Sequence, residues 1–362
     1  LRSMSIPDSW WRQALDPPGA SGPILAEGVL RAQPEDFQVE ELLGFAPSGT
    51  GSHVLLKVRK RNANTQWVAR ELARLCGCRP GDVGFAGLKD RHAVAIQWFS
   101  VPRSKLGTDE WARVQEAEFA VLEAHAHGRK LPRGALAGNR FGIRIRNVMP
   151  REPQDAETLA VRIGARLEGL ARQGVPNYFG PQRFGRGGSN LSRIHEERLR
   201  PPERGFVLSA ARSLVFNAVL AERVREGSWD RLESGDLANL DGRGSFFEVD
   251  TPDAILRERC ERLEIHPTGP MWGRGAPRTR SRVLELENRV AGQMAAAADL
   301  CAGAGMEQER RSLRLAVRDL AWQFDGPDVL LSFQLARGSF ATAVLRELFA
   351  TGCAADEPDS DG

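Results

Sequence analysis

Four polar residues, Lys89–His92, interrupt two apolar runs in the stretch GFAGLKDRHAVAIQWFS. The apolar side chains are Val83, Phe85, Ala86 and Leu88 before the group and Val94, Ile96, Trp98 and Phe99 after it. These runs predict short buried strands, and polar residues between them cost stability unless they face a cleft. Nearby cations favour the ionised form of a carboxyl group, so Asp90 is a candidate nucleophile or base. A surface turn with an ion pair is the alternative interpretation.

The charge of the chain is unevenly distributed, although the net charge is only +3. Between Lys57 and Arg91 nine Lys or Arg stand against three acids, and from Arg129 to Arg151 seven Lys or Arg stand against none. Acid-poor stretches close to the Lys89–His92 group favour a face that binds a polyanion. A solvated basic face with no ligand is the alternative.

Metal, membrane and secretion signals are weak. Cys76 and Cys78 are the only close pair among five cysteines, and His125 and His127 form a lone pair of histidines, so we expect no metal site. From the sequence we expect no apolar run that is long enough to span a bilayer, and no secretory signal is evident. We therefore expect a cytoplasmic, monomeric protein. At 362 residues, the chain predicts two domains.

The first part of the chain alternates short strands with little helix, which predicts an α+β fold with a mostly antiparallel sheet. The expected strands are Gly28–Ala32, Phe37–Leu42, His53–Arg61, Val94–Val101, Phe119–His127 and Arg140–Val148. A helix is expected from an Asn64 or Thr65 cap to about Cys76, ended by Gly77.

Helical patterns dominate the middle, and strand patterns return near the end. Expected helices are Asp155–Gln173, Ser209–Glu226, Pro252–Leu263, Val283–Ala302 and a last one from a Ser339 cap through Phe349, with strands at Ser312–Arg318 and Val329–Gln334. This order predicts a discontinuous first domain, 4–154 and 313–352, an inserted α/β domain, 155–312, and a disordered tail, 353–362.

Five separated blocks resemble, in order, the signature blocks of the TruD family of tRNA pseudouridine synthases. They are RAQPEDFQVEE (31–41), the GFAGLKDRHAVAIQWFS stretch (84–100), AGNRFGIRIRNV (137–148), GVPNYFGPQRFGRGG (174–188) and GSFATAVLREL (338–348). The resemblance implies a pseudouridine synthase fold with an inserted domain, and uridine 13 in the D-arm of tRNA as the substrate. It also implies that Asp90 is the catalytic aspartate.

The same resemblance places other residues at the substrate. Asn139 and Phe141 match the N-x-F motif, Phe37 matches the PEDF phenylalanine, and Phe340 matches the phenylalanine of the GSF block. Arg31 stands where relatives often have Lys; it keeps the charge without the compact ammonium. Core packing is the alternative for the three phenylalanines, and a turn position is the alternative for Asn139.

Pseudouridine formation breaks the N–C bond between uracil and ribose, turns the base and rejoins it through carbon. Nothing is oxidised or lost, so we expect no cofactor. An ionised carboxylate beside the sugar is required, and Asp90 could attack the anomeric carbon, attack the base or remove a ribose proton. Arg31 and Lys89 could stabilise the departing uracil anion. A role for Lys89 in binding phosphate or in the fold is the alternative.

Three residues of the GVPNYFGPQRFGRGG block have expected roles, and two alternative functions are open. Arg183 and Arg186 are expected to contact RNA phosphates. Tyr178, the only tyrosine, is expected to be structural or an RNA contact. The rivals are an RNA-binding protein without chemistry and a carboxylate-pair hydrolase that joins Asp90 to Glu35 or Asp36. Acids of a PEDF motif more often make caps and turn bonds, which disfavours the hydrolase.

Overall fold

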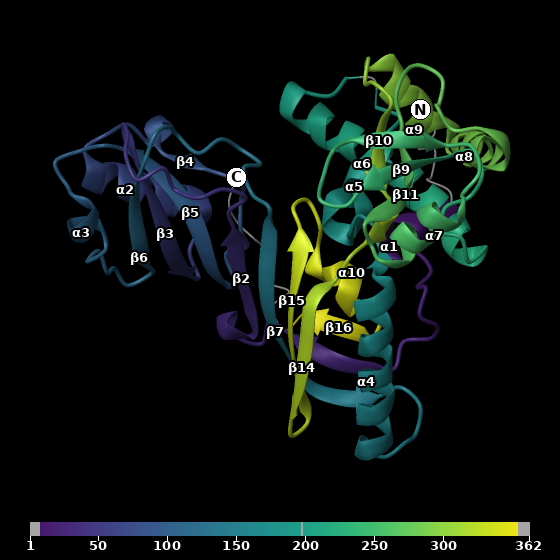
Figure 1. Ribbon diagram of the computed structural model, residues 1–362, viewed down its shortest axis with the longest axis horizontal. Coiled ribbons are helices and arrows are strands. Elements are labelled where there is room, and N and C mark those ends of the chain that lie inside the picture. The colour runs from purple at the N-terminus through teal and green to yellow at the C-terminus, as the bar shows by residue number, and fades with distance from the viewer. Residues whose placement is uncertain (1–7, 197, 354–362) are drawn as a thin grey trace. The chain divides into compact units, whose positions relative to one another are not determined.

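The computed structural model describes residues 8–196 and 198–353, which fall into two compact units (Figure 1). The sheet unit contains Leu25–Gly164, Arg318–Gly338 and, of the described C-terminal residues, 349–353. The helical unit contains residues 8–24, Ala165–Val317 and Ser339–Leu348. Segments from both ends of the sequence therefore belong to each unit.

The sheet unit is built on a ten-stranded sheet, in which seven strands follow the order β14-β15-β7-β2-β5-β3-β6. Its strands are β1 (Ala26–Leu30), β2 (Phe37–Leu42), β3 (His53–Arg61), β4 (Gly84–Phe85), β5 (Val94–Pro102), β6 (Phe119–His127), β7 (Gly138–Pro150), β14 (Arg318–Asp325), β15 (Asp328–Ala336) and β16 (Phe349–Cys353). Only the β1–β16 and β2–β5 pairs are parallel among those described. The predicted α+β class with a mostly antiparallel sheet is confirmed.

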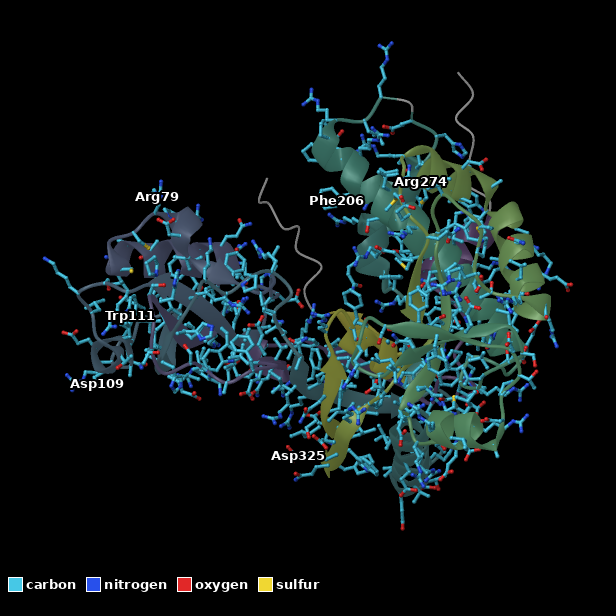
Figure 2. The ribbon with its side chains drawn as sticks, turned by 45° about the horizontal axis from the view of Figure 1, so that its top comes forward. Arg79, Asp109, Trp111, Phe206, Arg274 and Asp325 are labelled. Carbon is cyan, nitrogen blue, oxygen red and sulfur yellow. The ribbon has the colours of Figure 1, made fainter. Side chains whose placement is uncertain are left out.

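Helix α2 (Thr65–Cys76) covers the β3–β5–β6 part of the sheet. Its ends are as predicted: the Asn64 side chain accepts from the Gln66 N–H, and Gly77 takes a left-handed conformation with φ 72°. The apolar face of α2 packs on alternating residues of the strands, and the short α3 (Thr108–Trp111) adds Trp111, which is fully buried (Figure 2). This core fixes β5, the strand that follows the Lys89–His92 loop in the chain.

The helical unit has α6 at its centre, surrounded by other helices and a four-stranded sheet of order β10-β9-β11-β12. Its helices are α1 (Asp8–Leu15), α5 (Ser189–Ser192), α6 (Pro201–Arg225), α7 (Ala254–Glu261), α8 (Ser281–Gln293), α9 (Ala295–Gly303) and α10 (Ala341–Leu345), and α4 (Ala156–Gln173) ends in it. Its strands are β8 (Val175–Pro176), β9 (Asp236–Leu240), β10 (Phe246–Val249), β11 (Ile265–Met271), β12 (Glu309–Ser312) and β13 (Arg314–Leu315). Short 3-10 helices occur in both units: Pro34–Asp36 and Pro80–Asp82 in the sheet unit, and Pro181–Phe184 and Arg186–Gly188 in the helical unit.

Helix α6 corrects the expectation that no run is long enough to cross a membrane. By length and composition it is long and apolar enough, although 72% of its most apolar stretch is buried. The apolar run is not evident from the sequence because Arg212 and Asn217 interrupt it. Both of these polar side chains are buried in the structure. Burial of this extent is what the core helix of a globular unit shows.

Other differences lie where local signals compete. The prediction of the last helix, from a Ser339 cap through Phe349, is wrong. Helix α10 begins after Phe340 without a side-chain cap, and Phe349 starts strand β16. The expected Val283–Ala302 helix breaks at Met294 into α8 and α9. Leu88, predicted to be in a buried strand, is 62% exposed. The predicted disordered tail, 353–362, is wrong at its first residue, because Cys353 ends strand β16 and pairs with Leu30 of β1; the rest of the tail, 354–362, lies outside the described residues.

Candidate active site

Strand alternation gives the central part of the sheet two different faces. In register, Phe37 pairs with Ile143, Val39 with Phe141 and Glu41 with Asn139, and β15 brings Phe333 opposite Phe141. We call this the Phe141 face. The intervening residues, including Glu40, Arg140 and Arg144, point the other way and form the Arg144 face. Gly138 before Asn139 is needed because a Cβ there would collide with the Leu335 carbonyl oxygen.

Three aromatic rings line the Phe141 face. The Phe141 ring lies 6.1 Å from the Phe37 ring in an edge-to-face arrangement and 5.5 Å from the Phe333 ring. All three are buried, with 6% or less of each residue exposed. The rings therefore form a fixed apolar floor whose position depends on three strands.

Asp90 forms an ion pair with Arg31 at the border of this floor. Arg31 Nη2 donates to Asp90 Oδ2 at 2.6 Å, and the guanidinium carbon lies 4.2 Å from the centre of the Phe37 ring. Arg31 has φ +60°, a conformation that costs energy for a residue with a side chain and often marks functional sites. The Asp90 side chain is 55% exposed, more than its position between apolar runs predicts, because residues 87–93 form no strand.

Lys89 points away from Asp90 toward the interior. Its ammonium donates to Asn139 Oδ1 at 2.6 Å and lies 3.2 Å from Glu41 Oε1. Burial raises the pKa of Glu41, and the Lys89 ammonium offsets part of that effect. Because the Asn139 oxygen accepts from Lys89, the amide Nδ2 is left as the hydrogen-bond donor of that side chain. Lys89 thus sets which way the Asn139 amide points.

Buried side chains hold the backbone of the loop that carries Asp90. Gln97 donates to the Gly87 carbonyl oxygen at 2.6 Å, and Thr65 Oγ1 accepts from the Lys89 N–H at 3.1 Å. Lys60, which is fully buried, donates to the carbonyl oxygens of Ala63 and Asp90 at 2.7 and 2.8 Å. The loop is therefore fixed from below while the Asp90 side chain remains accessible.

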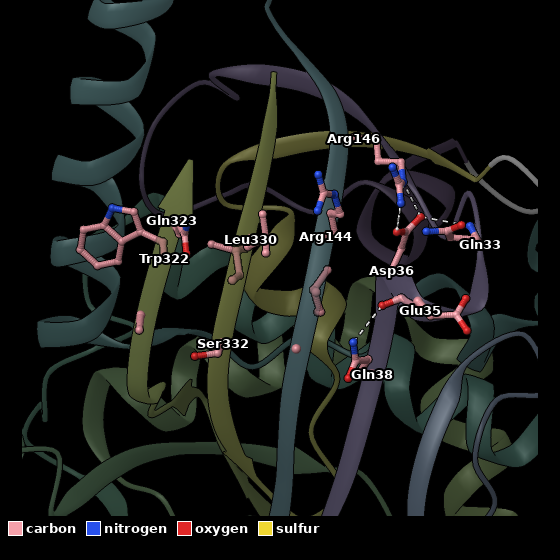
Figure 3. Close-up of a pocket in the computed structure, with 14 residues that line it drawn as sticks. Gln33, Glu35, Asp36, Gln38, Arg144, Arg146, Trp322, Gln323, Leu330 and Ser332 are labelled. Carbon is pink, nitrogen blue, oxygen red and sulfur yellow. Dashed lines mark hydrogen bonds and ion pairs between the residues drawn. The ribbon is translucent and has the colours of Figure 1, made fainter. Parts of the chain in front are cut away.

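The Arg144 face carries a separate hollow of about 510 Å³, shown in Figure 3. Asp36 and Glu35 line it, and Asp90 does not. Asp36 accepts from Arg146 and from the Gln33 N–H, and Glu35 accepts from Arg61. These acids make the cap and ion-pair contacts that the sequence favours for them, which removes support from the hydrolase with Asp90.

The remaining predicted residues belong to the helical unit. Phe340 is half-buried and packs against the core of that unit. Arg183 donates to Ser209 Oγ at 2.9 Å and is partly buried, which lowers its pKa, whereas Arg186 is exposed. Tyr178 is 2% exposed, and burial raises its pKa. The structure thus groups Asp90, Arg31, Phe37, Phe141, Asn139 and Lys89 within the sheet unit.

Four residues that support the loop were not predicted to do so from the sequence: Glu41, Lys60, Thr65 and Gln97. A signal existed for two of them. Glu41 continues the buried alternation of Phe37 and Val39, and Lys60 continues that of Val54, Leu56 and Val58. A charged residue in a core-facing position of a strand is costly and indicates a partner.

Comparisons with known proteins agree with the resemblance that the five sequence blocks indicated. A family model described as tRNA pseudouridine synthase D (TruD) matches residues 25–199 and 197–348. The chain is 46% identical over 345 residues to tRNA pseudouridine synthase D of Nitrosococcus oceani, covering 93% of this chain and 94% of the relative. It is 44% identical to the proteins of the same description from Methylococcus capsulatus and Pseudomonas aeruginosa, over 92% and 91% of this chain and 94% and 93% of those proteins.

The fold also matches a solved structure. The crystal structure of a Methanosarcina mazei protein described as a tRNA pseudouridine synthase D superposes with a TM-score of 0.70. The match covers 95% of this chain and 98% of that chain at 20% sequence identity. The overall α+β architecture, including the segments between the two parts of the sheet unit, is therefore shared.

Proposed function

Because the chain belongs to the TruD family of tRNA pseudouridine synthases, we propose that it isomerises uridine 13 in the D-arm of tRNA, with Asp90 as its catalytic carboxylate. The observation that carries the assignment is the Arg31–Asp90 ion pair at the border of the Phe37–Phe141 floor, together with the bond from the adjacent Lys89 to Asn139. Residues 4–154 and 313–352 form the catalytic domain in this proposal, and 155–312 form the insertion. We further propose that the protein acts in the cytoplasm as a monomer without a cofactor.

The geometry gives Asp90 the properties that the reaction needs. Its carboxylate is accessible, is bonded by Arg31 through one oxygen only, and stands on a loop held by buried side chains. A charged oxygen beside the ribose serves attack on the anomeric carbon, attack on the base or removal of a ribose proton. The Arg31 guanidinium supplies positive charge where negative charge develops on the departing uracil.

The floor and Asn139 fit a uracil that has left its stack. Unstacking costs a few kcal/mol, and contact with aromatic side chains returns about 1–3 kcal/mol per base. The buried rings of Phe37 and Phe141 support the pocket as a fixed surface. Asn139 Nδ2, oriented by Lys89, is a donor that matches a uracil carbonyl oxygen. We assign Phe340, Arg183 and Arg186 to the substrate on the family blocks alone.

Mapping pseudouridine in tRNA tests the proposal. Unmodified tRNA with uridine at position 13 is incubated with the purified protein, and pseudouridine is located by sequencing; a transcript with cytidine 13 is the control. We expect product at position 13 alone. Binding without product would favour the RNA-binding alternative, and release of free uracil would favour the hydrolase. Mapping cellular tRNA with and without the protein then identifies which tRNAs are used.

A further inference from the structure

The most unusual charged group of the sheet unit is Lys60, a lysine with no exposed surface, directly beneath the catalytic loop. Its ammonium lies 2.8 Å from the Asp90 carbonyl oxygen, 2.7 Å from that of Ala63 and 3.5 Å from that of Lys89. Building on the proposed function, we propose that Lys60 is a positioning residue for isomerisation: its ammonium holds the Asp90 backbone and keeps a positive charge beneath the carboxylate.

Stability alone does not account for a lysine at this position. An ammonium taken out of water loses its hydration, and burial lowers the pKa of Lys60 to about 8. Replacing buried charges by apolar groups of similar volume is often neutral or stabilising for a fold. An apolar side chain at position 60 would continue the Val54, Leu56 and Val58 row, but it could not bond the carbonyl of Asp90.

The charges around Lys60 come from two elements. Asp90 and Lys89 face it from the loop and Glu41 faces it from β2; Asp90 and Glu41 favour the ammonium, and Lys89 opposes it. Arg31 pairs with the Asp90 carboxylate itself. Asp90 is thus bonded by Arg31 at its side chain and by Lys60 at its backbone. Two cations, each with a separate contact, define where the carboxylate stands.

Lys57 provides a matched control on the same strand. It points to the opposite face of β3, where its ammonium lies 3.0 Å from both Glu40 and Glu123. Both lysines therefore carry a charge on β3 and make polar contacts, but only Lys60 contacts the Asp90 loop. Removing the Lys57 charge reports on the strand without touching the loop.

The test compares Lys60→Met, Lys60→Gln and Lys57→Met with the wild type in the full chain. Single-turnover pseudouridine formation on tRNA gives the rate, filter binding gives Kd, and thermal melting reports folding. Because small displacements of a reacting group can cost about 10²-fold in rate, we expect Lys60→Met to lose about 10²-fold while Kd changes less than about threefold. Lys57→Met should keep the wild-type rate.

A pH profile separates positioning by a charged group from a purely structural role. The wild-type rate should fall as pH rises through about 8, where Lys60 loses its proton. Lys60→Gln retains an amide donor but no charge, so its rate should be low and flat over this range. Lys57→Met should keep the alkaline decline of the wild type.

Several outcomes would overturn the inference while leaving the proposed function intact. They are a folded Lys60→Met with a wild-type rate, an alkaline decline that persists in Lys60→Gln, and failure of both Lys60 variants to fold, which would make Lys60 a folding residue. If the wild type itself forms no pseudouridine, the proposed function fails instead. The two failures are therefore distinguishable in one assay.

Discussion

Two aspartate–arginine pairs in the sheet unit use the same chemistry in opposite ways. Asp36 accepts three bonds from Arg146, at 2.8 to 3.0 Å, and one from the Gln33 N–H, and its side chain is 1% exposed. Asp90 accepts one bond from Arg31 at 2.6 Å and its side chain is 55% exposed. A carboxylate has about four acceptor positions: Asp36 fills them, whereas Asp90 does not fill them within the part of the chain that the structure describes.

The difference suggests how the two pairs divide their tasks. In the first pair a buried, fully bonded carboxylate fixes the turn that starts β2, and removing its partner Arg146 leaves a buried charge without compensation. An exposed pair contributes little to folding, about 0–1 kcal/mol, because water screens it. Asp90 therefore retains its acceptor capacity for a substrate. We expect substitutions at the two pairs to separate activity from stability.

The largest effect on activity is expected for Asp90→Asn. The substitution is nearly isosteric; it removes the charge and replaces one acceptor oxygen by an NH2 donor. Isomerisation should therefore fall by about 10²–10⁴-fold or more, with tRNA affinity kept within a few-fold. The melting temperature should stay close to that of the wild type because the pair with Arg31 is exposed. Single-turnover mapping, filter binding and thermal melting measure the three quantities. Retained activity would remove Asp90 from its role.

Phe141→Ala should reduce both activity and stability, since this residue belongs to the floor and to the core. Deleting a buried phenylalanine typically costs about 3–5 kcal/mol of unfolding free energy. Loss of the ring should also lower rate and affinity if a base stacks near it. Phe141→Leu is the control, because it restores apolar volume without an aromatic face. Equal activity of Phe141→Leu and wild type would leave Phe141 as a packing residue only.

Most elements near the candidate active site could be predicted from local patterns. Strands β2, β3 and β6 have the bounds expected from alternation, and α2 has the Asn64 cap and the Gly77 end expected from sequence. Asp90 and Arg31 stand out because the family blocks identify them. In these segments propensity, capping and hydrophobic pattern agree with one another, which is the condition for a reliable local prediction.

The support of the loop that carries Asp90 could not be predicted in the same way. That Lys60 reaches the carbonyl of Asp90, or that Lys89 turns to Asn139, depends on contacts between residues 30 and 50 positions apart. The end of the chain shows the same limit. Phe349 enters β16 because β1 pairs with it, although the preceding residues favour a longer helix. Partners distant in sequence decided each of these cases.

An exposed arginine of the helical unit that was assigned to RNA phosphates, Arg186, should affect the affinity for tRNA and the salt dependence of that affinity. Arg186 is exposed, whereas Arg183 is partly buried and bonded to Ser209. We expect Arg186→Gln to weaken tRNA binding and to reduce the slope of log K against log salt by about 1, as loss of one phosphate contact does. Arg183→Gln should change the slope less. Identical slopes in the wild type and the double variant would refute both assignments.

The smallest effect on activity is expected for Arg146→Ala, which should instead lower stability. Burial raises the pKa of the Asp36 carboxyl, but the bonds from Arg146 and from the Gln33 N–H together outweigh burial and bring that pKa below its usual 3.8. A carboxyl whose pKa is lower in the folded state stabilises the fold above its unfolded pKa, and this contribution disappears as pH falls through the folded pKa. Removal of Arg146 takes away much of that contribution at neutral pH.

Thermal melting of wild type and Arg146→Ala between pH 7 and pH 2 measures the effect. We expect the variant to melt at a lower temperature at pH 7 and the difference to shrink below about pH 4, where Asp36 becomes protonated in the unfolded chain. Arg31→Ala, the matched change at the exposed pair, should show little difference at any pH in this range. If Arg31→Ala loses as much stability as Arg146→Ala, the Asp90 pair is structural as well, and the division of tasks between the two pairs is wrong.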